Sequence, residues 1–231
     1  MSPSLLDIPS VRAYLGRKLI CSGPPNAKRL ALTFDDGPNP NNTPRLLDIL
    51  AERNIKATFF VIGRRVRRFR DLVERTANDG HEIGNHGDHH VPLSFLPRSV
   101  IRRELAVCGH LVEGVTGQQP RFMRPPMGWF NDKVLAVARE MGYEPVIGSI
   151  HPQDSRQPGL EVILRRVRRR IDPGAIIILH DGGWRIGVDR NQTLHAVETL
   201  TDELLADGYE FQTLSELLTE AAPGESAHEP L

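Results

Sequence analysis

Cysteine and long hydrophobic runs are both scarce in this sequence. Its 231 residues include two cysteines, Cys21 and Cys108, which are too few for a disulfide scaffold and match no CxxC metal or redox motif. We expect two small buried thiols, and the sequence leaves a disulfide between them open. No apolar run is longer than that at residues 175–179, which is far short of the roughly 20 residues that a membrane-spanning helix needs. We therefore expect no membrane span.

An excess of charge of one sign is also absent. Lys and Arg together number 29, as do Asp and Glu, so the formal net charge is zero. A chain without a basic excess lacks the electrostatic field that favours nucleic acid as a partner. Hydrophobic residues make up 39% of the chain. That content suffices for a core and excludes disorder of the whole chain.

Strand-like and helix-like segments alternate along most of the chain. The seven expected strands are 29–34, 56–62, 81–85, 122–124, 143–150, 175–179 and 209–213. The expected helices are 43–53, 64–79, 97–115, 131–141, 160–171, 192–207 and 214–220. Seven strand–helix units predict an α/β single domain with a parallel sheet, either a (β/α)7 barrel or an open doubly wound sheet.

The ends of the chain are expected to lie outside this domain. We predict an N-terminal extension over 1–28, the domain over 29–221 and a disordered tail over 222–231. The first 20 residues show no continuous apolar segment after a basic start, so they are not typical of a signal peptide. This favours a cytoplasmic location, or an extracytoplasmic one if a targeting segment was removed.

Polar residues gather where the predicted strands end. In a parallel sheet or barrel these carboxyl ends share one rim, which is where ligands bind. The residues at this predicted rim are Asp35, Asp36, His86, His90, Arg124, Asp154, His180 and Asp181. Their expected convergence points to a functional site more strongly than any one of them does.

His86 and His90 are spaced for metal binding. Four residues apart, two imidazoles can reach one ion, and Asp36 is the candidate third ligand. Three protein ligands with one open position are typical of a catalytic Zn²⁺ site. Co²⁺ or another divalent ion remains open. His89 is expected to point elsewhere.

Asp35 and Asp36 are neighbours, so within a strand they would point to opposite faces. Gly37-Pro38 breaks the strand, which could let both carboxylates face the rim. We expect Asp36 to bind the metal and Asp35 to remain free as a base. The alternative role for these two aspartates is to cap the next helix, but Asn41 and Asn42 are available as caps.

Arg124 and His180 complete the predicted chemistry. Arg124, followed by two prolines, could orient a carboxylate and lower its pKa, although a surface ion pair is as common. His180 follows an apolar strand and could act as a general acid tuned by Asp154. Its alternative is a buried structural histidine.

Two arginine-rich segments invite a different interpretation. Residues 64–70 and 165–170 could bind an anionic polymer such as nucleic acid. Their apolar residues recur at helical spacing, however, so we favour two outer helices with basic solvent-facing sides.

These motifs together resemble the polysaccharide deacetylase family (the NodB-homology domain of carbohydrate esterase family 4). The resemblance covers about Arg29–Leu218 and rests on TFDDGP at 33–38, GHEIGNH at 80–86 with His90, RPPMG at 124–128, Asp154, and LHD at 179–181. It implies a distorted (β/α)7 barrel and metal-assisted removal of acyl groups from glycans.

The resemblance also implies a role for each matched position. Asp35 matches the catalytic base, and Asp36, His86 and His90 match the metal ligands. Arg124 matches the arginine that orients the base, Asp154 the carboxylate that tunes the catalytic histidine, and His180 that histidine, the general acid. Leu179 matches the leucine that lines the pocket for the acetyl methyl group.

Three positions depart from the family pattern. Gly87 replaces the usual Ser or Thr, Met127 replaces a common Tyr in the substrate pocket, and Ser155 replaces a frequent Trp. The catalytic set is intact, so the departures bear on the substrate. We expect a monomeric N-deacetylase of glycans that contain N-acetylglucosamine. The alternatives are an O-acetyl esterase or deacylase of another acylated sugar, and an inactive metal-containing glycan-binding domain.

Overall fold

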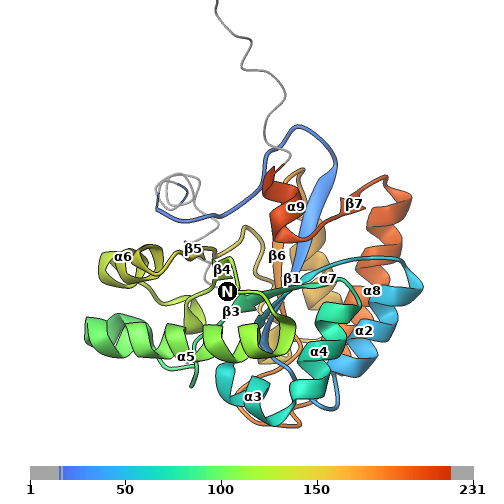
Figure 1. Cartoon of the computed structure of the whole chain (residues 1–231). Helices are drawn as coiled ribbons and strands as arrows, with labels where there is room; N and C mark the ends of the chain where they lie inside the picture. Colours follow the sequence, from blue (N-terminus) through green and yellow to red (C-terminus); the bar gives the residue numbers. More distant parts are fainter. Residues whose placement is uncertain (1–15, 17, 220–231) are drawn as a thin grey trace, which may run out of the picture.

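The computed structural model describes residue 16 and residues 18–219 (Figure 1). Its strands are β1 (Arg29–Gly37), β2 (Thr58–Val61), β3 (Glu82–Asn85), β4 (Phe122–Met123), β5 (Glu144–Pro145), β6 (Ile176–His180) and β7 (Glu210–Phe211). All of them pair in parallel in the order β5-β4-β3-β2-β1-β6, and β7 pairs with the start of β1. A further parallel bridge joins Ile150, after β5, to Ile177 of β6. This bridge closes the sheet into a distorted barrel and decides against the open sheet.

Helices surround the strands (Figure 1). They are α2 (Thr43–Glu52), α3 (Gly63–Arg68), α4 (Arg70–Asn78), α5 (Arg98–Thr116), α6 (Asp132–Glu140), α7 (Leu160–Arg168), α8 (Asn191–Ala206) and α9 (Leu214–Thr219), with short 3-10 turns at Leu93–Phe95, Pro126–Gly128 and Asp154–Arg156. Helix α7 packs on α8, and α5 packs on α3, α4 and α6. The predicted alternation of strands and helices is confirmed.

Two predicted elements differ from the structure. The helix expected over 64–79 is two helices, because the backbone of Phe69 leaves the helical region (φ −129°, ψ 50°). The strand expected over 143–150 is regular only in β5. Gly148 has a left-handed backbone (φ 96°), so the segment leaves β4 and reaches β6 only at Ile150.

Residues 18–28 pack against the barrel. Leu19 and Cys21 are buried with Leu135 and Ile147, and Ile20 bridges to Val146. Cys21 and Cys108 are both buried, and no disulfide joins them. Residues 1–15, 17 and 220–231, which include the predicted tail, lie outside the described residues, and the predicted domain limits remain a prediction. Among the described residues, no helix is long and apolar enough to cross a membrane.

Alternation along the strands separates the inside of the barrel from its outer shell. Leu30, Leu32 and Phe34 of β1 join the main core beneath the helices. Ala31 faces the inside, where the other apolar residues are Phe60, Phe122, Val146, Ile176, Leu214 and Leu217. Four residues further along β1, on the same inner face, lies Asp35, which is paired in register with His180 of β6. The sheet therefore brings these two side chains together at the carboxyl ends of the strands.

Candidate active site

A β-bulge explains how two consecutive aspartates reach the same site. Asp35 pairs with Phe60 and Gly37 with Val61, so Asp36 is an extra residue in β1. The backbone of Asp36 is left-handed (φ 70°), which is uncommon for a residue other than glycine. A bulge redirects the extra side chain. Asp36 thus faces the histidines instead of the outer shell, and β1 extends through Gly37 where the sequence predicted a break.

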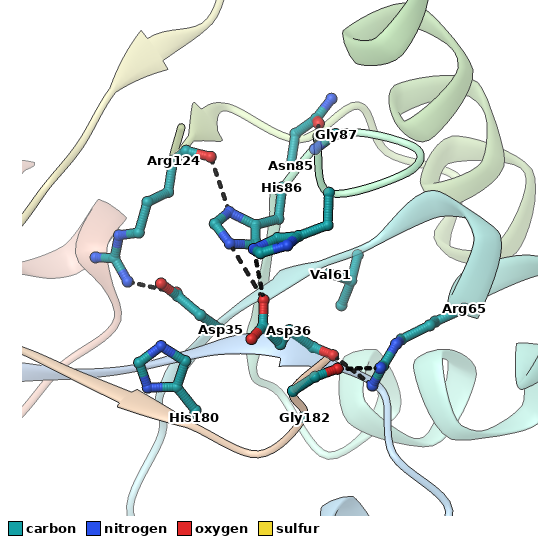
Figure 2. A network of polar contacts seen from close by, with 12 residues as sticks. Asp35, Asp36, Val61, Arg65, Asn85, His86, Gly87, Arg124, His180 and Gly182 are labelled. Carbon is teal, nitrogen blue, oxygen red and sulfur yellow. Dashed lines mark hydrogen bonds and ion pairs between the residues drawn. The ribbon is translucent and has the colours of Figure 1, made fainter. Parts of the chain in front are cut away.

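Asp36, His86 and His90 form a compact group of ligand atoms (Figure 2). Asp36 Oδ1 lies 3.0 Å from His90 Nε2 and 3.5 Å from His86 Nε2. Burial alone would raise the pKa of Asp36, but the contacts with the two histidines outweigh it and hold this pKa well below its usual value. Among the described residues, no other group of three such side chains comes this close.

The hydrogen bonding of His86 suits a metal ligand. Its Nδ1 lies 2.8 Å from the carbonyl oxygen of Arg124, and a carbonyl can only accept, so Nδ1 carries the proton. In the neutral ring Nε2 then presents a lone pair toward Asp36. A lone pair facing a carboxylate is favourable when a cation lies between them, and a carbonyl partner of this kind is common behind metal-binding histidines.

The spacing also fits a small divalent ion. Ligand atoms about 2.0 Å from a tetrahedral Zn²⁺ lie about 3.3 Å from each other. The separations of 3.0 and 3.5 Å between Asp36 Oδ1 and the two histidine nitrogens lie on either side of that value, and all three ligand atoms lie within 4.8 Å of one another. The three residues therefore fit a zinc ion with one coordination position left open.

Asp35 faces the same site but has a different partner. Arg124 Nη1 donates to Asp35 Oδ1 at 2.6 Å and to Thr33 Oγ1 at 2.8 Å. The guanidinium carbon of Arg124 lies 4.1 Å from the centre of the Phe60 ring. Arg124 is 1% exposed, so the surface ion pair considered from the sequence is excluded. Its side chain is fixed and orients the Asp35 carboxylate.

His180 and Asp154 form the third part of the site. The Asp154 carboxylate lies 2.8 Å from His180 Nδ1 and accepts from the backbone N–H of His180 at 2.9 Å and from Thr193 Oγ1 at 2.9 Å. Burial would lower the pKa of His180, but the negative charge of Asp154 outweighs it and raises this pKa to about 9. Burial would raise the pKa of Asp154, but the charge of His180 lowers it. His180 is thereby held protonated.

A cavity of about 510 Å³ opens onto these groups; we call it the site cavity. Met127 lines it, as the resemblance implied. Leu179 is placed differently from the expectation, because it is fully buried in the main core and Ile178 lines the cavity instead. Ile178 lies two residues from His180 and so shares its face of β6.

Sequence reasoning missed His151, which also lines the site cavity. Its ring centre lies 5.9 Å from that of His180. Burial, with a smaller contribution from the charge of His180, lowers the pKa of His151 to about 4, so the ring is neutral. Its Nε2 has no hydrogen-bond partner within the part of the chain that the structure describes. The sequence offered one signal that could have identified His151, which is its position three residues before Asp154.

The first arginine-rich segment was expected to turn its arginines to solvent, and Arg65 shows that this expectation is wrong for one of them. Arg65 is 2% exposed, and its Nη1 donates to the backbone oxygen of Asp36 at 2.8 Å (Figure 2). Its Nη2 donates to the backbone oxygen of Gly183. Arg65 therefore supports the bulge from behind. The second segment is an outer helix with a basic solvent-facing side, as expected. Its Ile163 and Val167 are buried, and its Arg165 and Arg168 are exposed.

Capping of α2 also differs from the prediction. Neither Asn41 nor Asn42 caps the helix with its side chain; Asn42 donates instead to the backbone oxygens of Asp181 and Val188. Asp181 is buried, and its carboxylate accepts from Thr43 Oγ1. Burial raises the pKa of Asp181 to about 6. Asp181 therefore ties β6 to the start of α2 and lies outside the cavity lining.

Comparisons with known proteins agree with this geometry. The polysaccharide deacetylase family profile matches residues 22–146. A peptidoglycan-N-acetylglucosamine deacetylase from Bacillus cereus is 41% identical over 197 residues, 84% of this chain and 90% of that protein. A chitooligosaccharide deacetylase from Bradyrhizobium sp. is 37% identical over 194 residues, 80% of this chain and 89% of that protein. The chain belongs to the polysaccharide deacetylase family.

Solved structures show the same fold. The crystal structure of a peptidoglycan N-acetylglucosamine deacetylase aligns with a TM-score of 0.85 at 31% identity, over 90% of this chain and 96% of that chain. A CE4-family pseudoenzyme from Bacillus anthracis aligns with a TM-score of 0.79 at 31% identity, over 86% of this chain and 68% of that chain. Relatives of this fold thus include active and inactive proteins, so activity must be argued from the site residues.

Proposed function

We propose that this chain is a metal-dependent N-deacetylase of glycans that contain N-acetylglucosamine. The observation that carries the proposal is the arrangement at the end of β1. Asp36 lies within 3.5 Å of two histidine nitrogens, while Asp35, the next residue along the chain, is held by Arg124 and left free of that group. The relatives named as deacetylases of peptidoglycan and chitooligosaccharides support the substrate class.

The residues divide the reaction between them. A divalent ion held by Asp36, His86 and His90, most simply Zn²⁺, would supply Lewis acidity to the acyl carbonyl and to the attacking water. Asp35, oriented by Arg124, accepts a proton from that water. His180, kept protonated by Asp154, donates a proton to the leaving amine as the carbon–nitrogen bond breaks. Met127 and Ile178 form part of the wall on which the acyl group and sugar rest.

One specific observation favours catalysis over glycan binding alone. A binding domain has no need of a fixed histidine beside a fixed carboxylate, yet Asp154 holds His180 at 2.8 Å and raises its pKa, and Arg124 holds Asp35 at 2.6 Å. His180 and Asp35 are register partners on adjacent strands, so acid and base face each other across one cavity. This arrangement is expected of a general acid–base pair.

Acetate release tests the proposal. Zinc-reconstituted protein is incubated with a short chitooligosaccharide and with peptidoglycan fragments, and Asp35→Asn serves as the control. We expect acetate from the wild type and little from the variant. Acetate from an O-acetylated sugar alone would replace the proposal with an O-acetyl esterase. Glycan binding without acetate from any substrate would replace it with an inactive binding domain.

A further inference from the structure

The loop after β3, residues 86–90, carries two of the three candidate ligands and departs from regular backbone; Figure 2 shows its start at His86 and Gly87. Parallel pairing with β2 ends where the N–H of His86 donates to Val61. Beyond that point Gly87 and His90 are left-handed (φ 75° and 57°). For His90, a residue with a side chain, this conformation is uncommon. The loop therefore depends on contacts from other elements for its shape.

Glu104 of α5 provides such contacts between the two histidines. Its Oε2 accepts the backbone N–H of Asp88 at 3.1 Å and that of His89 at 2.8 Å. Its Oε1 lies 2.8 Å from His89 Nδ1. Glu104 is 8% exposed, and a buried carboxylate that accepts several hydrogen bonds holds its donors strongly. His89, expected only to point elsewhere, thus takes part in this contact.

The other side of the loop rests on α3. The N–H of Gly63 donates to the oxygen of Gly87, and that of Arg64 to the oxygen of Asp88, both at 3.0 Å. Arg67 donates to the Asp88 carboxylate at 2.8 and 3.0 Å. The carbonyls of Gly87 and Asp88 are thus bound by α3. Of the three amides between the ligands, that of Gly87 donates to Asn85 Oδ1 at 2.9 Å, and the other two are bound by one oxygen of Glu104.

We propose that Glu104 is a positioning residue of the metal site. By fixing the Asp88 and His89 amides, it sets the angle at which His86 and His90 face Asp36, and so the affinity and coordination geometry of the bound divalent ion. This inference rests on the metal site of the proposed function but not on its substrate. Groups behind the ligands of a metal site typically change affinity by about 10–100-fold when removed.

Zinc affinity of the full chain, measured by competition with a chromophoric chelator, tests the inference. We expect Glu104→Ala to weaken zinc binding by about 10–100-fold. Glu104→Gln should recover most of the affinity, because its amide oxygen can still accept both N–H groups. The absorption spectrum of the Co²⁺-loaded proteins should change in shape for Glu104→Ala and resemble wild type for Glu104→Gln, which a loss of general stability would not produce.

Glu113→Ala is the matched control, since Glu113 is an exposed glutamate on the same helix. It should bind zinc as the wild type does. Equal affinities for Glu104→Ala and Glu113→Ala would overturn the inference. If circular dichroism shows that Glu104→Ala does not fold, Glu104→Asp replaces it; its shorter side chain cannot reach both amides, and wild-type affinity there would also overturn the inference. Zinc binding without acetate release would contradict only the proposed function.

Discussion

Two cavities of equal volume, about 510 Å³ each, lie at opposite ends of the strands. The site cavity lies at the carboxyl ends. The other, which we call the amino-end cavity, is lined by residues that include His81, Glu82, Arg121 and Glu216. Both are lined by carboxylates, arginine and histidine, so neither size nor residue type distinguishes them.

The hydrogen bonding of the two cavities does distinguish them. In the amino-end cavity, Glu82 accepts from Thr58 Oγ1 at 2.9 Å and Ser215 Oγ at 2.5 Å, and Glu216 accepts from Thr213. These groups link β2, β3 and α9. In the site cavity, Arg124 Nε and Nη2 and His151 Nε2 are buried without a partner within the described part of the chain. The polar groups of the amino-end cavity are thus used to join elements of the fold, whereas the site cavity keeps side-chain groups that can still bind a ligand.

The largest expected effect comes from removing a metal ligand. His86→Ala should abolish zinc binding and lower acetate release by at least about 1000-fold, because several kcal/mol of transition-state stabilisation would be lost. Zinc content after dialysis and the acetate assay measure the two effects. His81→Asn in the amino-end cavity should keep both near wild type, and activity in metal-free His86→Ala protein would contradict the metal site.

Acid and base variants should come next in size. Asp35→Asn and His180→Ala should each lower kcat by about 10²–10⁴-fold, since each removes one proton transfer. Both should retain zinc, because neither residue belongs to the ligand group. Kinetics on zinc-saturated protein check this, and near-wild-type rates in either variant would reject that role.

The pH dependence of kcat/KM should then show the titration of His180. Because a general acid must be protonated, kcat/KM should fall as pH rises through about 9, the pKa to which Asp154 raises His180. Asp154→Asn removes the charge and should move this fall to lower pH. The contact between Asp154 and His180 also stabilises the fold. Its contribution to the free energy of unfolding is complete below pH 6.5, the ordinary pKa of histidine, and is lost as pH rises through about 9. An unmoved pH profile in Asp154→Asn would rule out the tuning role.

A substitution in the amino-end cavity should have a smaller effect, and on stability instead of activity. Glu82→Gln weakens hydrogen bonds that join β2, β3 and α9 and should lower the free energy of unfolding by about 1–2 kcal/mol. Its kcat should stay unchanged. Denaturant unfolding and the acetate assay together measure the contrast, and a large loss of kcat without loss of stability would give this cavity a function.

The smallest effect concerns the cysteines. Because Cys21 and Cys108 are buried and not joined by a disulfide, adding a reducing agent should leave the melting temperature unchanged. Burial raises the pKa of the Cys108 thiol to about 12, so it should react slowly with thiol reagents at neutral pH. A fall in melting temperature on reduction would indicate a disulfide after all.

Much of the site could be predicted because the strands of a parallel barrel end at one rim. Asp35, His86, Arg124 and His180 follow or close short apolar strands, and this placement alone predicted that they converge. Leu179 was misplaced for a related reason. It lies next to His180 in sequence, but alternation turns it to the outer core and leaves Ile178 in the cavity.

Other contacts join segments too far apart for any pattern to reveal. Arg65 resembles its arginine neighbours in sequence, and only the fold places it beneath Asp36. Glu104 lies on a helix whose periodicity says nothing about the loop it binds. The break at Phe69 and the partial strand after Tyr143 depend on single backbone angles, which tertiary packing sets against local preference.

Hydrophobic periodicity and local spacing were enough to predict the order of strands and helices, the gathering of polar residues at one rim, and the candidates for the acid, the base and the metal ligands. How Asp36 reaches the histidines, in contrast, depends on contacts that exist only in the folded protein. Its bulge needs a left-handed residue stabilised by Arg65, and that stabilisation exists only once β1, α3 and the loop after β6 have packed together.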